Sequence, residues 1–360
     1  MKRRDLLARA GSLGLMSLTT PLWAQGPSPD VLSPLLPSWE AWKTAYLQDD
    51  GRIVDAFSEG ASHSESQGYG LYLSVLFHDA DAFRSIYLWT EGNLAIRGDG
   101  LLAWRWRPDT TPHVPDMNNA SDGDVFYAWA LMNGATLFDM PECRARAAAI
   151  VEGVIRACLP AVPSDAGRRL LLPGAEGFVR AEGTIFNASY WMPRLMSDLA
   201  TGFAKPELQR AADDGVARLS DMAATGLPPD WMMATPTGWA APPEGFSPNT
   251  GYEAMRIPLY LCLSGMSGHP MVARFRDAYM STAGQDDGTA TVFNSQTGEA
   301  VERSPNIGYA ALAGLATCAA PQGASLPIPL FTTEQPYYPA TLHLFVLIAQ
   351  LQGFPQCTLI

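Results

Sequence analysis

The sequence predicts an all-α fold in which helical hairpins close into a ring. Three observations carry this prediction: apolar residues recur at helical spacing along most of the chain, segments with strand-like alternation are few, and long loops mostly follow every second helix. In such a ring the loops gather on one face and build a groove there. A solenoid of helical repeats is the structural alternative, but its regular repeat length is not visible in this sequence.

The expected helices follow one another with few interruptions. Loops rich in Gly, Pro and Asp separate them, and one short segment, "GFVRAEGTIF" at residues 177–186, has the pattern of a hairpin. Helical periodicity marks out residues 38–48, 66–79, 81–95, 122–139, 141–159, 189–202, 205–224, 252–265, 269–282, 306–319 and 338–352.

Residues 1–24 have the pattern of a secretory signal peptide. A basic start with adjacent Arg3 and Arg4 precedes a modest apolar stretch and small residues near Ala24, and the arginine pair suggests the twin-arginine route. No other run of 18 or more apolar residues occurs. We therefore expect cleavage, no membrane insertion of the mature protein, and one domain over residues 25–360 in the periplasm or outside the cell.

The acidic balance of the chain limits its partners. The formal net charge is −12, and removal of residues 1–24, which carry +3, changes it to −15. A surface of this sign repels phosphate backbones and anionic lipids, which argues against nucleic acid or a membrane surface as partner. A neutral polymer remains compatible with this charge.

The five cysteines do not have the spacing of a metal site. Cys143 and Cys158 lie on one expected helix, ~22 Å apart at ~1.5 Å per residue, so they cannot bridge each other. Cys262 lies in an apolar run. We expect mostly buried thiols, and no disulfide scaffold.

Three acidic residues stand where a loop leads into a helix. Glu65 lies in "SHSESQGYG", Asp122 in "NNASDGDVF", and Glu253 follows "SPNTGY", with Arg256 three residues later on the same helical face. Each alone has a simpler interpretation as a partner of the helix dipole, to which Asp122 is well suited. Together they would bring carboxylates to one rim of the ring.

A helix cap is the simplest explanation of the segment around Glu65. Ser62 or Ser64 could cap the following helix, and Glu65 would then complement its positive end.

Loop aromatics accompany the acidic junctions. Loops run over the surface, so tryptophan is unusual there as a core residue, and a flat indole face suits the C–H surface of a pyranose ring. Two carboxyl groups beside a groove, with aromatic platforms, predict glycoside hydrolysis by an acid and a base. The aromatics in or beside loops are Trp104, Trp106, Tyr190, Trp191, Trp231, Trp239, Tyr337 and Tyr338.

Other chemistries lack their motifs. The bare H-x-E at residues 63–65 has no P-C-x-x-C partner, which excludes a zinc deaminase. H-E-x-x-H, G-x-S-x-G and a Gly-rich phosphate loop are absent from the sequence. The five histidines are scattered. We therefore expect no metal and no cofactor.

Four segments in order resemble the motifs of family 8 glycoside hydrolases, especially the endoglucanases that accompany bacterial cellulose synthases. "SESQGYGLYL" is similar to the family's S-E-G-Q-G-Y-G-M, "ASDGD" to A-[ST]-D-[AG]-D, "FNASY" to F-N-P-S-Y, and "YEAMRIP" to Y-D-A-x-R-x-P. "GLPPDW" is similar to a G-L-x-P-D-W stretch of the cellulose-operon members. The resemblance spans most of residues 25–360.

The resemblance implies an (α/α)6 barrel with an open groove that hydrolyses β-1,4-glucan with inversion, in support of cellulose secretion. It implies Glu65 as general acid, Asp122 as the residue that holds and distorts the sugar, Tyr190 beside the attacking water, and Arg256 as the residue that orients the base. It implies Trp104 as a sugar-stacking residue, and Gly68 and Gly70 as positions that let the chain and the substrate come close. We also expect Trp106, Tyr69, Trp191 and Tyr338 to contact the sugar.

The position of the catalytic base carries Glu253 where the family has Asp. Glutamate has the same chemistry and a reach longer by ~1.5 Å, one carbon–carbon bond. We expect a working base, with a glucan-binding protein of impaired catalysis as the alternative. Chitosanase, lichenase and xylanase activities of the same family stay open. Lesser departures are Ser66 for Gly, Ala188 for Pro and Tyr127 for Ile or Met.

Overall fold

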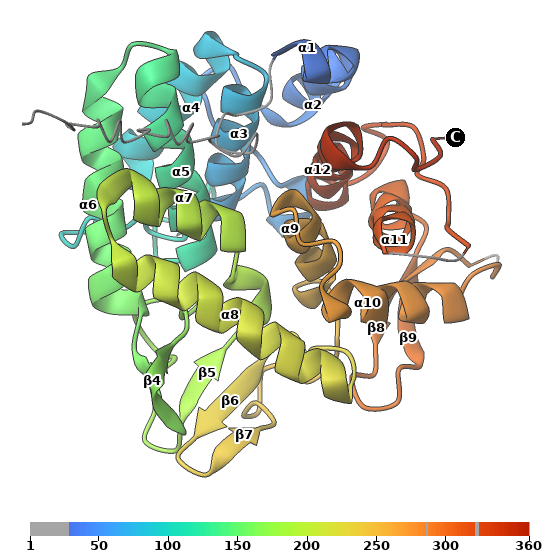
Figure 1. The fold of residues 1–360 in the computed structure, drawn as a ribbon. Helices are drawn as coiled ribbons and strands as arrows, with labels where there is room; N and C mark the ends of the chain where they lie inside the picture. The colour runs from blue at the N-terminus through green and yellow to red at the C-terminus, as the bar shows by residue number, and fades with distance from the viewer. Residues whose placement is uncertain (1–28, 286, 321–323, 360) are drawn as a thin grey trace, which may run out of the picture.

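The computed structural model describes residues 29–285, 287–320 and 324–359, and helices dominate it (Figure 1). The expected signal peptide lies outside these residues. The α-helices are α1 (Pro29–Leu32), α2 (Leu36–Tyr46), α3 (Ser64–Leu76), α4 (Ala80–Asn93), α5 (Ser121–Leu137), α6 (Pro141–Cys158), α7 (Pro193–Phe203), α8 (Pro206–Thr225), α9 (Ile257–Leu263), α10 (Pro270–Ser281), α11 (Ile307–Ala319) and α12 (Tyr337–Gly353).

Short strands and 3-10 helices occupy the connections. The antiparallel sheets pair β1 with β2, β3 with β4, β5 with β6 and β7, and β8 with β9. Their bounds are β1 (Ser62–His63), β2 (Arg105–Trp106), β3 (Ala161–Val162), β4 (Asp165–Arg169), β5 (Thr184–Phe186), β6 (Met232–Thr235), β7 (Gly238–Ala240), β8 (Thr289–Phe293) and β9 (Ala300–Ser304); the 3-10 helices are η2 (Ser33–Leu35), η3 (Ala56–Ser58), η4 (Ala188–Tyr190) and η5 (Ala254–Arg256).

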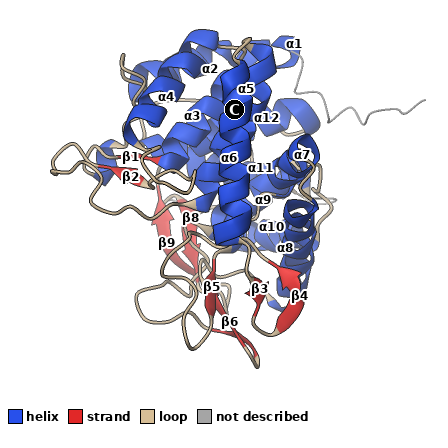
Figure 2. Ribbon diagram, turned by 90° about the vertical axis from the view of Figure 1, so that its left-hand side faces the viewer, coloured by secondary structure: helices blue, strands red, loops and turns tan. Residues whose placement is uncertain are grey.

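Consecutive helices form the predicted hairpins. Short turns join α3 to α4, α5 to α6, α7 to α8 and α9 to α10, whereas the longer connections carry the strands. Figure 2 shows the strands gathered toward one end of the helical body. The loops therefore collect on one face, as their spacing predicts.

Burial separates the helices that line the centre from those that cover them. α3, α5, α9 and α12 are buried along nearly their whole length, whereas α4, α6, α8 and α10 bury one face. α3 packs on α5, α5 on α7, α7 on α9, and α9 on α12. Phe345 of α12 meets the rings of Tyr69 and Tyr72 of α3, which closes the ring. This arrangement is the predicted (α/α)6 barrel.

The boundaries of two expected elements differ from the sequence prediction. The segment expected as a helix from residue 189 begins as η4 and becomes α7 only at Pro193, which suits the first turn of a helix. The expected hairpin at 177–186 is present but short: an antiparallel bridge joins Val179 to Thr184, and the backbone N–H of Ile185 donates to the Phe178 carbonyl at 2.8 Å. β5 also pairs with β6. No helix in the described ranges is long and apolar enough to cross a membrane.

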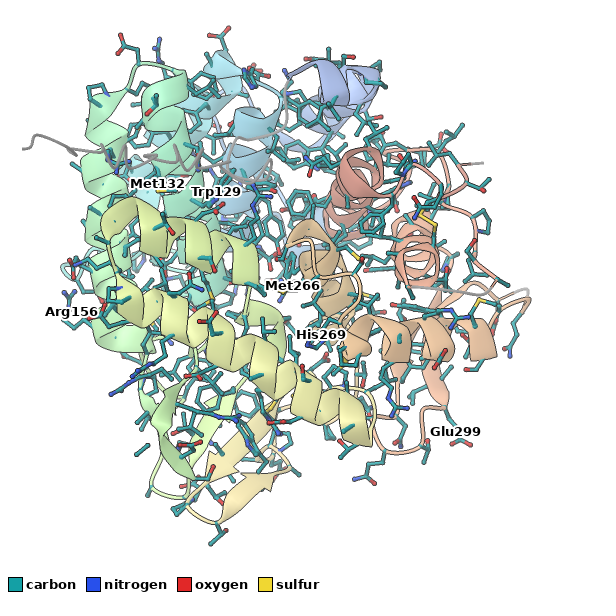
Figure 3. All side chains as sticks on the ribbon, in the orientation of Figure 1. Trp129, Met132, Arg156, Met266, His269 and Glu299 are labelled. Carbon is teal, nitrogen blue, oxygen red and sulfur yellow. A yellow bond between two sulfur atoms is a disulfide. The ribbon has the colours of Figure 1, made fainter. Side chains whose placement is uncertain are left out.

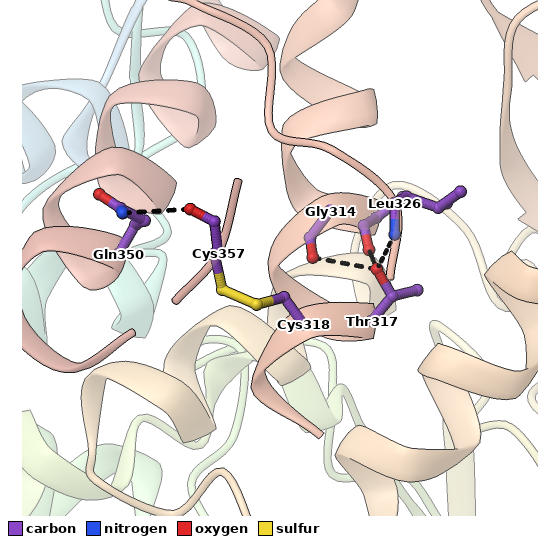
Figure 4. The surroundings of a disulfide bond; sticks show 7 residues. Gly314, Thr317, Cys318, Leu326, Gln350 and Cys357 are labelled. Carbon is purple, nitrogen blue, oxygen red and sulfur yellow. Dashed lines mark hydrogen bonds between the residues drawn. A yellow bond between two sulfur atoms is a disulfide. The ribbon is translucent and has the colours of Figure 1, made fainter. Parts of the chain in front are cut away.

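The cysteine prediction is wrong at one pair. Cys318 at the end of α11 and Cys357 in the C-terminal segment form a disulfide (Figure 4). Cys143, Cys158 and Cys262 are buried free thiols, as expected. The bridge joins residues separated by 39 positions, a pairing that spacing alone does not reveal.

The disulfide should stabilise the barrel by limiting the unfolded chain. For a loop of this length we expect Cys318→Ser/Cys357→Ser to lower the free energy of unfolding by about 2–4 kcal/mol, measured by urea denaturation. Dithiothreitol should destabilise the wild type by a similar amount and leave the double variant unchanged. Equal stability of the two proteins without reductant would contradict this role.

Candidate active site

The first turns of α3 and α5 meet at the strand end of the barrel. Glu65 is the second residue of α3 and Asp122 the second residue of α5. Gly123 permits the contact, because a Cβ there would lie 2.6 Å from the Glu65 backbone nitrogen. Both carboxylates thus stand at positive helix ends, where the backbone favours negative charge.

The cap of α3 differs from the expected one. Ser62 donates its hydroxyl to the Ile53 carbonyl at 2.6 Å, and Ser64 Oγ is buried with no hydrogen-bond partner. Instead, the backbone N–H of His63 donates to Ser66 Oγ at 3.0 Å. Ser66, one of the departures from the family pattern, therefore supplies the hydrogen-bond acceptor for the backbone N–H of His63 at the start of α3.

The two glycines behind Glu65 serve helix packing, contrary to the expectation that they admit a substrate. A Cβ on Gly68 would lie 3.0 Å from the Gly123 carbonyl oxygen of α5. A Cβ on Gly70 would collide with the side chain of Ile53. Both positions bring α3 close to its neighbours in the core.

A single buried guanidinium joins the three acidic junctions. Nη1 of Arg256 donates to Glu65 Oε2 and lies 3.4 Å from Asp122 Oδ2, while Nη2 donates to Glu253 Oε2. The three carboxylates predicted at separate helix starts therefore converge on one residue of η5. The resemblance implies that Arg256 orients Glu253; the geometry shows that it contacts Glu65 as well.

Asn187 and Ser189, which the sequence did not single out, complete the surroundings of Glu253. Asn187 Nδ2 donates to Glu253 Oε2 at 3.2 Å, and Ser189 Oγ lies 3.3 Å from the same oxygen. Ser189 Oγ also accepts from Arg256 Nη2 at 2.7 Å. Both residues belong to the "FNASY" segment, so their position in the sequence next to Tyr190 could have identified them as site residues.

The cluster combines two buried side chains with two partly exposed carboxylates. Arg256 and Asp122 expose 1% and 2% of their side chains, whereas Glu65 and Glu253 expose 21% and 34%. Glu65 and Glu253 can therefore meet a substrate or water, while Asp122 and Arg256 act from beneath.

Burial and like charge favour a proton on Glu65. Desolvation, with contributions from the Asp122 and Glu253 charges and a hydrogen bond shared with Asp122, raises the pKa of Glu65 to about 8 against the opposing charge of Arg256. Desolvation also raises the pKa of Asp122, while the hydrogen bond from Glu65 opposes that rise. Glu65 is therefore the protonated partner of this pair near neutral pH.

Tyrosines enclose the cluster. Arg256 lies over the ring of Tyr190, 5.8 Å from its centroid, and the half-buried Tyr338 donates its hydroxyl to the Tyr252 carbonyl at 2.5 Å. Desolvation raises the pKa of Tyr190 and of Tyr338 well above 10. Both phenols stay neutral; the O–H of Tyr338 is engaged by Tyr252, whereas that of Tyr190 can donate a hydrogen bond beside the carboxylates.

Trp104 lies directly beside the start of α3. Its carbonyl accepts from the Ser64 backbone at 2.9 Å, its ring stacks on His63 at 5.9 Å, and its Nε1–H donates to Asp116 at 2.8 Å. Its partly exposed ring is thus held in a fixed orientation next to Glu65.

Trp106 is more enclosed than Trp104. The guanidinium of Arg52 lies 4.9 Å from its ring centroid, and the His113 ring lies 4.6 Å away. Trp89 meets it edge-on from α4.

Two expected sugar-contacting residues are buried, which corrects their assignment. Trp191 is 2% exposed, and its Nε1–H donates to the Leu171 carbonyl at 3.0 Å. Tyr69 is fully buried, with its hydroxyl 2.6 Å from that of Tyr260 and 3.1 Å from Arg256 Nη1. Tyr69 can act on the site only through Arg256, and Trp191 packs the core.

A small cavity between α3, α5, α7 and α9 is not a sugar site. Its volume of about 30 Å³ suits about two water molecules. Tyr72, Arg194 and Trp129, the last labelled in Figure 3, contribute to its lining. Within the described residues, no group of His, Cys, Asp and Glu is arranged to hold a metal ion.

Known proteins share this sequence pattern and this fold. A probable endoglucanase of Novacetimonas hansenii is 35% identical over 257 residues, covering 69% of this chain and 72% of that protein. The endo-β-1,4-glucanase CMCax from Acetobacter xylinum superposes with a TM-score of 0.78 at 29% identity, over 90% of this chain and 98% of that one. Endoglucanase Cel10 from Klebsiella pneumoniae superposes with a TM-score of 0.77 at 28% identity, over 87% of this chain and 98% of that one. The model of glycosyl hydrolases family 8 matches residues 30–352, and the chain therefore belongs to that family.

Proposed function

We propose that this protein is an endo-β-1,4-glucanase that hydrolyses internal bonds of cellulose with inversion at the anomeric carbon. The observation that carries the proposal is the bridge by Arg256 between two partly exposed carboxylates, Glu65 and Glu253. The endoglucanase names of the similar proteins support glucan as the substrate.

In this proposal each carboxylate has a distinct role. Glu65, which retains its proton near neutral pH, donates it to the glycosidic oxygen of the leaving chain. Glu253 removes a proton from the water that attacks from the opposite face, and an inverting mechanism requires roughly 6.5–9.5 Å between the two carboxyl groups. Asp122, which is buried beneath Glu65 and so does not meet the sugar as the resemblance implies, acts by raising the pKa of Glu65.

The contacts of Glu253 favour a working base over a glucan-binding protein of impaired catalysis. Its carboxylate is held by Arg256, Asn187 and Ser189, while a third of the side chain stays open. A longer arm that is held in this way loses the freedom that would misplace it.

We also propose that the protein is exported and acts on glucan chains produced by cellulose synthesis. The pattern of residues 1–24 supports export, and the Cys318–Cys357 disulfide suits an oxidising compartment. A Cys318–Cys357 disulfide in protein isolated from the periplasm would support this location, and reduced thiols at these two positions would contradict it.

Proton NMR of the mature protein acting on cellohexaose tests the proposed reaction. Early α-anomer signals that later mutarotate are expected of an inverting β-glucanase. Early β-anomer signals would contradict inversion. Cleavage of chitosan or xylan oligomers in place of cellohexaose would assign one of the alternative substrates, and binding without new reducing ends would favour the glucan-binding alternative.

Glu65→Gln should abolish most turnover and preserve binding. The amide cannot supply the proton, so kcat should fall by about 10²–10⁴-fold. Calorimetric titration with cellohexaose should give a dissociation constant close to that of the wild type. Glu207→Gln, on the exposed side of α8, is the matched control and should keep full activity. Retained turnover in Glu65→Gln would rule out its role as acid.

The pH profile should report the proton on Glu65. Because the acid form is the active one, kcat/KM should fall as the pH rises through about 8. Asp122→Asn removes a negative neighbour that raises the pKa of Glu65, so this basic limb should move to lower pH. A limb that stays in place or moves upward in Asp122→Asn would refute the coupling.

Glu253→Asp should reduce activity although it restores the family residue. Shortening the side chain withdraws the carboxylate from Asn187 and Ser189, and a displacement of about 1 Å can lower kcat about 100-fold. Steady-state rates on cellohexaose measure the loss. If Glu253→Asp is as fast as the wild type, the longer side chain of Glu253 is not required for activity.

A further inference from the structure

The segment that carries Glu253 and Arg256 begins a helix without a cap of its own. Glu253 occupies the position before η5, with φ −83° and ψ −60°, and its side chain makes no capping hydrogen bond. The carboxylate reaches Arg256, Asn187 and Ser189 instead. The first backbone N–H groups of η5 therefore need an acceptor from elsewhere in the chain.

Asp230, from the loop after α8, supplies that acceptor. Its Oδ1 accepts from the backbone N–H of Gly251 and of Ala254, both at 2.8 Å. These two amides lie on either side of Glu253. Asp230 is 7% exposed, and its own N–H donates to the Asn249 carbonyl at 2.7 Å. One carboxylate oxygen thus fixes the backbone before and after the proposed base.

The packing around Asp230 leaves little freedom in this arrangement. A Cβ on Gly251 would lie 2.6 Å from Asp230 Oδ2, so the glycine admits the carboxylate against the backbone. Thr250 is bound to Phe293 of β8 through backbone hydrogen bonds of 2.9 and 2.8 Å. The turn is therefore held from two sides, by the loop of Asp230 and by β8.

We propose that Asp230 is a positioning residue for catalysis: it caps the turn at residues 251–254 in place of Glu253 and thereby leaves the Glu253 carboxylate available as the base. The inference rests on the proposed glucanase function. It explains how a base with one more rotatable bond than Asp is delivered to a fixed place, since the backbone that carries it is fixed first.

Kinetics of Asp230→Ala on cellohexaose test this inference, with Asp230→Asn as the conservative variant. Loss of the acceptor should lower kcat by about 10–100-fold and change KM by less than about threefold, because the turn moves and the sugar contacts do not. The amide oxygen of Asn can accept the same two N–H bonds, so Asp230→Asn should recover most of kcat.

Asp79→Ala is the matched control. Asp79 caps α4 by accepting from the Ala82 N–H at 3.0 Å, and it makes no contact with the carboxylate cluster. Its loss should lower the melting temperature without lowering kcat. Gly251→Ala is a second variant that displaces the Asp230 carboxylate, and it should reproduce the loss of kcat if Asp230→Ala does not fold.

The outcomes separate this inference from the proposed function. A folded Asp230→Ala with wild-type kcat, a loss confined to KM, or an Asn variant as slow as the Ala variant would overturn the positioning role. If Asp230→Ala does not fold, wild-type kcat in Gly251→Ala would overturn it as well. An inactive wild type in the same assay would overturn the glucanase proposal itself.

Discussion

The site depends on an imbalance of charge in a buried place. One guanidinium, that of Arg256, faces three carboxylates, and Arg256 and Asp122 have almost no contact with solvent. A buried charge is tolerated only when it is paired, and a single positive charge cannot neutralise three negative ones. The imbalance is relieved by a proton on Glu65. A general acid requires this same protonated state, so both the burial of the cluster and the proposed chemistry favour a protonated Glu65.

The barrel stabilises this cluster of carboxylates through the positions of its helix starts. Its central helices begin at the same end, so the first turns of α3 and α5 present positive helix ends to the carboxylates. The close contact at Gly123 joins these two turns, and η5 brings Arg256 and Glu253 to them from the far side of the ring. Residues from distant parts of the chain thus meet because hairpin follows hairpin and the strand-bearing connections lie toward one end of the helical body.

Much of this arrangement could be predicted from the sequence, because it depends on local pattern. Loop spacing predicts the ring of hairpins, and the junction positions of Glu65, Asp122 and Glu253 predict convergence. The burial of Trp191 and Tyr69 could not be predicted, since an aromatic beside a loop can face either way until its neighbours are placed. The disulfide of Cys318 pairs distant positions. The capping of the turn by Asp230 likewise depends on tertiary contact.

The most direct test is to measure whether Glu65 is protonated near neutral pH in the free enzyme. Carbon-13 NMR of protein labelled at the glutamate side-chain carboxyl would follow each group through a pH titration. If Glu65 holds the proton, one resonance should titrate near pH 8, far above the others, and should disappear in Glu65→Gln. Titration of every glutamate near the ordinary value of about 4.3 would contradict it, because Glu65 would then be ionised at neutral pH and could not donate the proton.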